Sequence, residues 1–428
     1  MQRRVVITGL GVVAPNGIGK EAFWDACVSG RSGIRRISRF DASALKTQIA
    51  GEVVGFQPRR MGITPEEARA LDRGTQFALA ATNLARADAA LPDELSLEER
   101  ERAGIYLGSA MAGGEEGERL WLRLTNGGTQ PPALAPGEHI PAFTLLSSLV
   151  PASAVAAHHQ LYGPCTVIST GCSAGADAIG QAFWTIQEGR ADRMFAGGSD
   201  SSISYAGISV FNVMRALSTR NDEPERASRP YDGLRDGFVL AEGAGVLLLE
   251  ERSLALARGA HIYAELIGFT STSNAYHMTA LPEKGEPLQH LLRQALADAE
   301  ITPQQLDYIN SHGSSTPTNE SAETAAYKAV FGSQAYHIPI SATKSMIGHT
   351  QGAASAIEAV VTALVLERQV VPPTINQEQA DPLCDLDYVP NVARQATVNV
   401  ALSHSSGFGG VNTALLLARP DWSESHAS

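Results

Sequence analysis

Apolar runs that suit buried strands alternate with helical patterns along the whole chain. The strand patterns occupy residues 4–8, 104–108, 166–168, 191–199, 239–250, 263–268, 306–309, 398–402 and 413–417. The helical patterns occupy residues 20–29, 64–88, 287–299 and 322–331, and two more follow Cys172 and His349. This alternation predicts an α/β protein with helices packed on both faces of its sheets.

The order of these elements repeats about halfway along the chain. Each half contains a strand, a turn with a reactive side chain and a helix of small residues, with Cys172 in the first turn and His349 in the second. We therefore predict two internally duplicated halves. Residues 1–259 form the half with the cysteine, and residues 260–428 form the half with two histidines. No linker composition separates the halves, so we expect them to pack as one body.

A glycine-rich motif follows the first strand pattern and loosely matches a dinucleotide-binding turn. That turn requires a helix to begin among the glycines. Here Val12 and Val13 continue the strand after Gly9 and Gly11, and residues 15–17 (Pro-Asn-Gly) then form a turn. The pattern favours a buried strand that ends in a loop.

Charge and composition exclude several classes of function. The formal net charge of −12 and the pI of about 5.4 argue against a general nucleic-acid binder. Four scattered cysteines without a CxxC pair indicate neither a disulfide framework nor a zinc site. Apolar runs such as residues 246–249 are too short to span a membrane, and no signal-peptide pattern is visible. We expect a cytoplasmic enzyme that binds neither nucleic acid nor membrane.

Cys172 lies between a β-branched run and a helical pattern. Small neighbours, Gly171, Ser173 and Ala174, allow a sharp turn that leaves the sulfur accessible. A helix N-terminus favours the thiolate, so this position predicts a lowered pKa and a usable nucleophile. The alternative is a small cysteine buried beneath a helix.

Three further turns carry residues that suit acyl chemistry. They are residues 310–316 with His312, residues 344–349 with Lys344 and His349, and the glycine-rich residues 405–412 with Phe408. Taken singly, each has an ordinary explanation, because a lone histidine is more often a core residue and a glycine-rich stretch is usually a loop. Their joint occurrence with Cys172, in this order, indicates a catalytic site.

The four turns resemble those of the β-ketoacyl carrier-protein synthases, the condensing ketosynthases of fatty acid and polyketide assembly. The resemblance covers essentially the whole chain and includes residues 220–222, 227–230 and 242–245. It implies a thiolase-like α/β fold with α-β-α-β-α layers. It also implies that the reaction needs no metal, nicotinamide or other cofactor.

The resemblance assigns roles to individual residues. Cys172 accepts the acyl chain, and His312 and His349 stabilise the enolate that forms when malonyl loses CO2. The backbone N–H groups of Cys172 and Phe408 form an oxyanion hole, and Phe408 also acts as a gate. Lys344 and Glu358 orient His349.

Other residues are expected near the substrate or its carrier. Thr316, Thr279 and His277 are expected to line the acyl site. The adjacent His158 and His159 face different directions and are expected at the surface or at an interface, not as metal ligands. Acidic carrier proteins require a basic entrance, for which the candidates are Arg69, Arg73 and Arg220. Solvated surface charge is the alternative for each of these arginines.

Departures from the fatty acid pattern favour the catalytic subunit of type II polyketide systems. They are Ser406, where fatty acid enzymes tend to have an aromatic residue, and residues 237–242 and 323–328. A separate departure is Glu320, where many synthases have Asp, and we expect the loop contacts there to differ. Polyketide or polyene elongation is therefore the expected pathway, and housekeeping fatty acid elongation is the alternative. A third hypothesis is a non-catalytic chain-length partner subunit. Such partners lack the nucleophile, so the presence of Cys172 argues against it.

The family resemblance implies a dimer formed by edge strands near Cys172. The second subunit is either a second copy or a Cys-lacking chain-length-factor paralogue. The expected substrates are acyl- and malonyl-loaded acyl carrier proteins.

Overall fold

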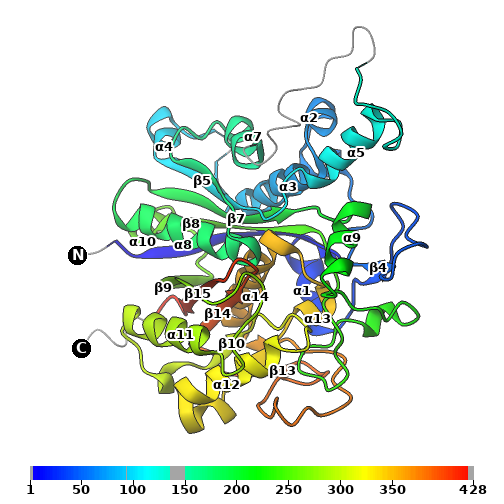
Figure 1. Cartoon of the computed structure of the whole chain (residues 1–428). Helices are drawn as coiled ribbons and strands as arrows, with labels where there is room; N and C mark the ends of the chain where they lie inside the picture. Colours follow the sequence, from blue (N-terminus) through cyan, green and yellow to red (C-terminus); the bar gives the residue numbers. More distant parts are fainter. Residues whose placement is uncertain (1–2, 93, 135–149, 423–428) are drawn as a thin grey trace.

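Two sets of five strands form the framework of the protein in a computed structural model that describes residues 3–92, 94–134 and 150–422 (Figure 1). The first set contains β1 (Val5–Ala14), β5 (Ala103–Gly108), β6 (Cys165–Ile168), β7 (Arg193–Asp200) and β8 (Gly243–Glu251). The second contains β9 (Ala264–Ser273), β10 (Tyr308–Asn310), β11 (Ile340–Ser341), β14 (Val400–Ser406) and β15 (Val411–Ala418).

The two sets have the same topology. The spatial orders are β6-β5-β7-β8-β1 and β11-β10-β14-β15-β9, which in both sets is third, second, fourth, fifth and first along the chain. In each set the first three strands of this order pair in parallel. The fourth strand pairs antiparallel with both the third and the fifth. The predicted internal duplication is thus confirmed. Val5–Ile7 of β1 pairs with residues 264–266 of β9 and joins the sets. The boundary at residues 259 and 260 stays a prediction.

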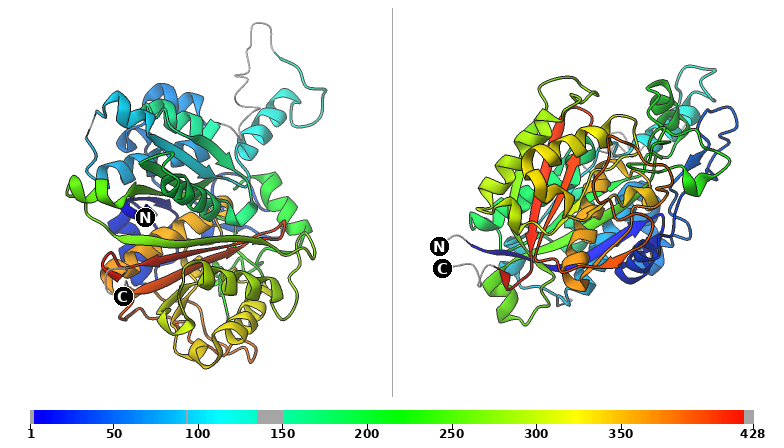
Figure 2. Two further views of the ribbon diagram at one scale, coloured as in Figure 1. Left: turned by 90° about the vertical axis from the view of Figure 1, so that its left-hand side faces the viewer. Right: turned by 90° about the horizontal axis from the view of Figure 1, so that it is seen from below.

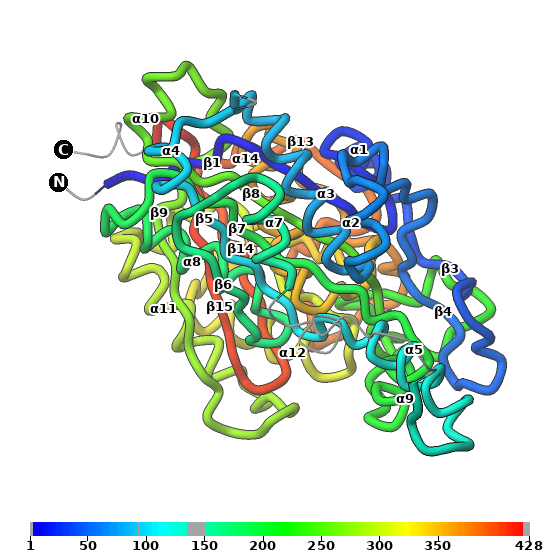
Figure 3. Tube along the Cα trace, turned by 90° about the horizontal axis from the view of Figure 1, so that it is seen from above, coloured from blue at the N-terminus to red at the C-terminus, as the bar shows by residue number. Residues whose placement is uncertain are grey.

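Helices lie between and outside the two sets of strands. α8 (Ala174–Gln187) and α14 (Ala354–Arg368) contact each other and form the middle layer. α3 (Arg73–Asp88) and α7 (Val150–His159) cover the first set, and α11 (Glu286–Asp298) covers the second beside α12 (Asn319–Phe331). Figure 2 shows the two halves from the side, and Figure 3 shows α3 and α7 above the first set. The layers are those predicted, α-β-α-β-α.

The middle helices are buried almost all round, which explains their composition. α14 is buried from Ala354 to Leu366 and consists mainly of Ala, Val, Leu and Ile. A helix covered on all sides is apolar on all sides, without the polar stripe of a surface helix.

Shorter elements complete the described structure. They are β2 (Gly17–Ile18), α1 (Lys20–Val28), β3 (Arg35–Arg36), β4 (Ile49–Ala50), η1 (Pro58–Met61), α2 (Pro65–Ala70), α4 (Leu97–Glu101), α5 (Gly114–Leu124), η3 (Gly171–Ser173), α9 (Tyr205–Val213), η4 (Pro224–Arg226), α10 (Arg252–Ala257), η5 (Pro303–Gln305), η6 (Gly332–Tyr336), α13 (Lys344–Ile347), η7 (Gln351–Ala353), β12 (Val370–Val371) and β13 (Arg394–Gln395), where η marks a 3-10 turn.

The predicted helix over residues 64–88 is in fact two helices. Thr64 caps α2, and Leu71 then adopts an extended conformation with φ −100° and ψ 142°. Asp72 starts α3 by accepting a hydrogen bond from the Thr75 backbone N–H at 2.7 Å. Two N-cap residues eight positions apart therefore begin two separate helices.

The N-terminal glycines belong to a buried strand, as predicted. All residues of β1 are buried, and no helix begins among its glycines. A Cβ atom at Gly11 would lie 1.8 Å from the carbonyl oxygen of Ala81 in α3. The glycine therefore allows a helix backbone to pack directly on the strand.

Replacing Gly11 by Ala should destabilise the protein by about 1–3 kcal/mol, because backbone must move to admit the methyl group. Thermal or denaturant unfolding measures this change. Gly117→Ala is the matched control, because a Cβ atom at this position of α5 meets no atom within 4 Å. The control should be neutral or stabilising by up to about 1 kcal/mol. Equal effects of the two substitutions would contradict the packing argument.

Candidate active site

Cys172 lies in the 3-10 turn η3, between β6 and α8, as the sequence pattern predicts. The Ser173 hydroxyl donates hydrogen bonds to the carbonyl oxygens of Val411 at 3.0 Å and Ser405 at 3.3 Å. These bonds hold the turn against β14 and β15 of the second half. Cys172 itself is only 5 % exposed.

The prediction of a lowered cysteine pKa is wrong. Burial raises the pKa of the Cys172 thiol to about 11, although the charge of Lys344 and the backbone N–H of Phe408 act in the opposite direction. The helix α8 begins only at Ala174, and loss of water around the sulfur is the largest cause of the raised pKa. The resting nucleophile is therefore a neutral thiol.

His312 and His349 meet beside Cys172. His312 follows β10 and His349 follows α13, and their ring centroids are 5.4 Å apart. Both histidines are buried. Together with Cys172 they line one cavity of about 70 Å³. The nucleophile comes from the first half and the two imidazoles come from the second.

Hydrogen bonds orient both imidazoles. Nδ1 of His349 accepts from the Gln351 backbone N–H at 3.2 Å. Nδ1 of His312 lies 3.5 Å from the Lys344 ammonium and 3.2 Å from the Ser405 hydroxyl. A backbone N–H or an ammonium beside Nδ1 disfavours a proton there, so in each neutral ring Nε2 carries the N–H.

Both imidazoles are held in the neutral form. Burial is the first cause that lowers the pKa of His312 and His349 well below the usual value, and the charge of Lys344 is the second. Neutral rings with Nε2–H groups are hydrogen-bond donors for a carbonyl oxygen that gains negative charge.

Lys344 and Glu358 form a buried ion pair, but its direct contact is with His312. The Lys344 ammonium bonds the Glu358 carboxylate and donates to the His312 carbonyl oxygen at 2.8 Å. Lys344 starts the single-turn helix α13, and its charge also acts on His349. That the pair orients His349 stays a prediction. Burial raises the pKa of Glu358 to about 7, although the charge of Lys344 acts in the opposite direction.

Phe408 lies where a gate is expected. It is partly buried, lines the cavity with Cys172 and stacks on Phe211 with ring centroids 6.5 Å apart. Positive φ angles at Gly409 and Gly410 shape the turn that carries it. Its movement as a gate stays a prediction.

The same cavity contains the expected substrate residues and several that the sequence analysis missed. Thr316, Thr279 and His277 line it as expected. The residues that were missed also line it: Phe238, Asn274, Asn319 and Gln351. Gln351 follows His349 by two positions. Its place in the same turn was the signal that could have predicted it as a cavity residue.

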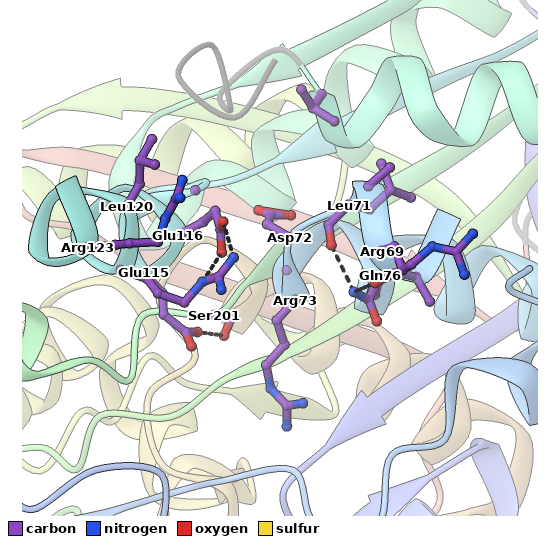
Figure 4. A pocket seen from close by; sticks show the side chains of 16 residues that line it. Arg69, Leu71, Asp72, Arg73, Gln76, Glu115, Glu116, Leu120, Arg123 and Ser201 are labelled. Carbon is purple, nitrogen blue, oxygen red and sulfur yellow. Dashed lines mark hydrogen bonds and ion pairs between the residues drawn. The ribbon is translucent and has the colours of Figure 1, made fainter. Parts of the chain in front are cut away.

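The three candidate arginines have different surroundings. Arg69 is exposed on α2 beside a separate cavity of about 500 Å³, where Figure 4 shows Arg73 extending away from the other labelled side chains. Arg73 donates to both carboxylate oxygens of buried Glu242, at 2.7 and 2.9 Å. Its side chain is 26 % exposed and lines the same cavity as Arg69, and its role in carrier-protein binding stays a prediction. Arg220 pairs with Glu223 at 3.5 Å.

Glu320 fits the loop after His312 despite its extra methylene. It is fully buried and accepts from the Ser315 backbone N–H at 2.5 Å, and Arg235 lies 3.2 Å from its second oxygen. Burial and neighbouring Glu323 raise the pKa of Glu320 to about 7. Its carboxylate thus supports Ser315, whose φ is +71°.

The adjacent histidines His158 and His159 do not line this cavity. His158 bonds Glu67 at 2.7 Å, and His159 stacks on Phe195 within the first half. His159 is half-buried, and burial lowers its pKa to about 3. The described residues contain no group of three or more His, Cys, Asp and Glu that would hold a metal. Within the same ranges, no helix is long and apolar enough to cross a membrane.

Comparison with protein families gives a match over most of the chain. The family model of the β-ketoacyl synthase N-terminal domain matches residues 2–255, and that of the C-terminal domain matches residues 263–378. The chain belongs to the β-ketoacyl synthase family. It is a condensing acyltransferase, and the thiolase-like fold expected from the sequence is confirmed.

Two relatives are similar over nearly the whole length. A putative polyketide β-ketoacyl synthase 1 of Streptomyces cyaneus is 45% identical over 98% of this chain and 99% of its own. The 3-oxoacyl-[acyl-carrier-protein] synthase 2 of Coxiella burnetii is 43% identical, again over 98% and 99%.

Two solved structures share the fold. One contains a type II polyketide acyl-carrier protein in complex with its ketosynthase bound to the hexaketide, with TM-score 0.89, 39% identity and coverage of 98% and 100%. The other is the ishigamide ketosynthase/chain length factor, with TM-score 0.88, 34% identity and coverage of 98% and 100%.

The raised pKa of Cys172 predicts how its alkylation depends on pH. A neutral thiol with a pKa of about 11 should react with iodoacetamide about tenfold faster for each pH unit up to pH ~9.5, without a plateau. Peptide mapping by mass spectrometry separates Cys172 from the exposed Cys165. A plateau near neutral pH would instead indicate a thiolate stabilised by the helix.

Proposed function

We propose that this protein elongates acyl chains on acyl carrier proteins in type II polyketide biosynthesis. The observation that supports this proposal most directly is the meeting of Cys172, His312 and His349 at one buried cavity. A thiol nucleophile beside two neutral N–H donors suits both steps of a decarboxylative condensation.

In the first step Cys172 takes an acyl group from a carrier-protein thioester. The bond from Sγ to the acyl carbon forms, the carbon–sulfur bond of the donor breaks, and the thiol proton leaves on the released donor thiol. Because the pKa of Cys172 is raised, this proton departs as the new bond forms and passes to the sulfur of the released donor. The backbone N–H groups of Cys172 and Phe408 both act on the thiol, which supports their proposed role as the oxyanion hole.

In the second step a malonyl thioester loses CO2. The Nε2–H groups of His312 and His349 donate to its thioester oxygen while the bond to the carboxylate breaks and its electron pair forms the enolate. The enolate carbon then attacks the acyl carbonyl and releases the Cys172 thiolate. That thiolate takes up a proton from solvent and regenerates the thiol, because burial disfavours its charge.

Two observations favour polyketide elongation. Ser406 adds a buried hydroxyl to the cavity wall where an aromatic ring is the fatty acid pattern. Similarity to polyketide synthases is also high over the whole chain. Fatty acid elongation is the second candidate, because the Coxiella synthase is almost as similar. The expectations of a cytoplasmic location and of no cofactor stay predictions.

The proposed partners are acyl carrier proteins and a second ketosynthase-type subunit. β6 is an edge strand that pairs only with β5 in the described structure, and its outer side is free for another chain. Solved relatives include a ketosynthase with a carrier protein and one with a chain length factor. We propose a Cys-lacking paralogue as the second subunit, and a homodimer is the alternative.

Two single variants should separate the two chemical steps. Cys172→Ala should abolish acylation while malonyl decarboxylation continues, because the imidazole donors remain. His349→Ala should retain acylation and slow decarboxylation by about 10²–10³-fold, the effect of losing one oxyanion donor. Intact-mass analysis of the protein measures the first step and CO2 release measures the second. The proposed function would be contradicted if wild-type Cys172 took no acyl group from a loaded carrier protein.

Removing the charge of Arg69 should weaken use of the carrier protein. Arg69→Ala should raise the KM for acyl carrier protein by about two- to fivefold, as expected for an exposed ion pair. Acylation by a small thioester should not change. Arg293→Ala, on exposed α11, is the control and should leave both values unaltered. Equal effects on carrier-bound and small thioesters would remove Arg69 from the docking surface.

A further inference from the structure

Gln351 is a polar side chain in the active-site cavity that the mechanism above does not use. It lines the cavity with Cys172 and both catalytic histidines and is only 4 % exposed. Its amide Nε2 is buried and has no hydrogen-bond partner in the described part of the chain. A buried donor without a partner is costly, and an incoming ligand with an acceptor oxygen relieves that cost.

The backbone of Gln351 is in a conformation that side chains rarely adopt. Its φ is +55°, in the left-handed region, and its N–H bonds Nδ1 of His349. Such strain persists where the surrounding structure enforces it, and it concentrates at functional sites. The turn therefore holds the Gln351 side chain in place while its backbone orients a catalytic imidazole.

The next residue connects this turn to the wall beyond Cys172. The Gly352 backbone N–H donates to Asp200 at 2.6 Å, and the same buried carboxylate accepts from the N–H groups of Ala110 at 2.8 Å and Met111 at 3.0 Å. A Cβ atom at Gly352 would lie 2.5 Å from the Ala110 nitrogen. Gln351 thus belongs to the buried part of the cavity, called here its inner end, and to the turn η7 that contacts η3.

We infer that the side-chain amide of Gln351 donates a hydrogen bond to the 3-oxo oxygen of an acyl chain held on Cys172. The cavity then favours β-oxoacyl chains over fully reduced chains of the same length. This inference rests on the proposed function, since it requires an acyl chain on Cys172.

The position of the Gln351 amide favours the acyl chain on Cys172, rather than the malonyl group, as its hydrogen-bond partner. The mouth of the cavity is lined by exposed His277, Thr279 and Met278, the last being 73 % exposed. A carrier-bound malonyl group enters from that side. The acyl chain extends from the sulfur toward the inner end, and its third carbon carries the oxygen two bonds beyond the thioester carbonyl. A buried amide donor there distinguishes a ketone from a methylene group.

The test compares acylation of Cys172 by the 3-oxobutanoyl and butanoyl thioesters of N-acetylcysteamine. These probes have acyl chains of equal length and differ in the 3-oxo group. Intact-mass analysis gives an acylation rate constant for each probe. The ratio of the two rate constants is then compared between wild type and each variant, so that the intrinsic reactivity of each thioester cancels. From wild type to Gln351→Leu the preference for 3-oxobutanoyl should fall about tenfold, the effect of one hydrogen bond.

Two further variants complete the design. Gln181→Leu makes the same change on the exposed face of α8 and should keep the wild-type ratio. Gln351→Gly suits the left-handed backbone and also lacks the amide, so it should show the same loss and replaces Gln351→Leu if that variant does not fold.

The outcomes separate the inference from the proposed function. If wild-type Cys172 is acylated by neither probe nor by loaded carrier protein, the proposed function itself fails. If acylation proceeds and both position-351 variants retain the wild-type ratio, only the inference is overturned. A higher KM for malonyl with an unchanged ratio would assign the amide to the malonyl carboxylate and also overturn it.

Discussion

The buried charge of Lys344 sets the electrostatics of the active site. Its ammonium bonds Glu358 and the His312 carbonyl, in a site that excludes water. The charge helps keep His312 and His349 neutral, and it opposes the effect of burial on Cys172. A buried ion pair of this kind contributes little net stability, but losing one partner leaves an uncompensated charge that costs about 3–5 kcal/mol. The Lys344–Glu358 pair thus matters most for the electric field that its charges exert on the reactive side chains.

The duplicated fold explains why the reactive groups meet. In each half the reactive turn lies between the third strand and the middle-layer helix: Cys172 precedes α8, and His349 precedes α14. The middle layer brings the beginnings of these helices together, so that η3 contacts η7. His312 follows β10, the second strand of its set, and joins them from the same half as His349. Because the site lies between two similar halves, one half can provide the nucleophile and the other half the hydrogen-bond donors.

Most of the fold and the identity of the reactive residues were predictable from local pattern. Strand and helix periods and the glycine-rich turns act over a few residues, and they correctly indicated the layered α/β architecture. The combination of Cys172, His312 and His349 in its order was sufficient to recognise the kind of site. The break between α2 and α3 was missed, although Asp72 was a local signal for it.

The sequence by itself thus determined the elements, the duplication and the set of reactive side chains. Only the tertiary structure decided the pKa of Cys172, because desolvation depends on every group that packs around the sulfur. It also decided that Lys344 contacts His312 and that Arg73 is held by Glu242, pairs that are 32 and 169 residues apart. Local periodicity carries no information about such partners, since they are set by how distant strands and helices pack.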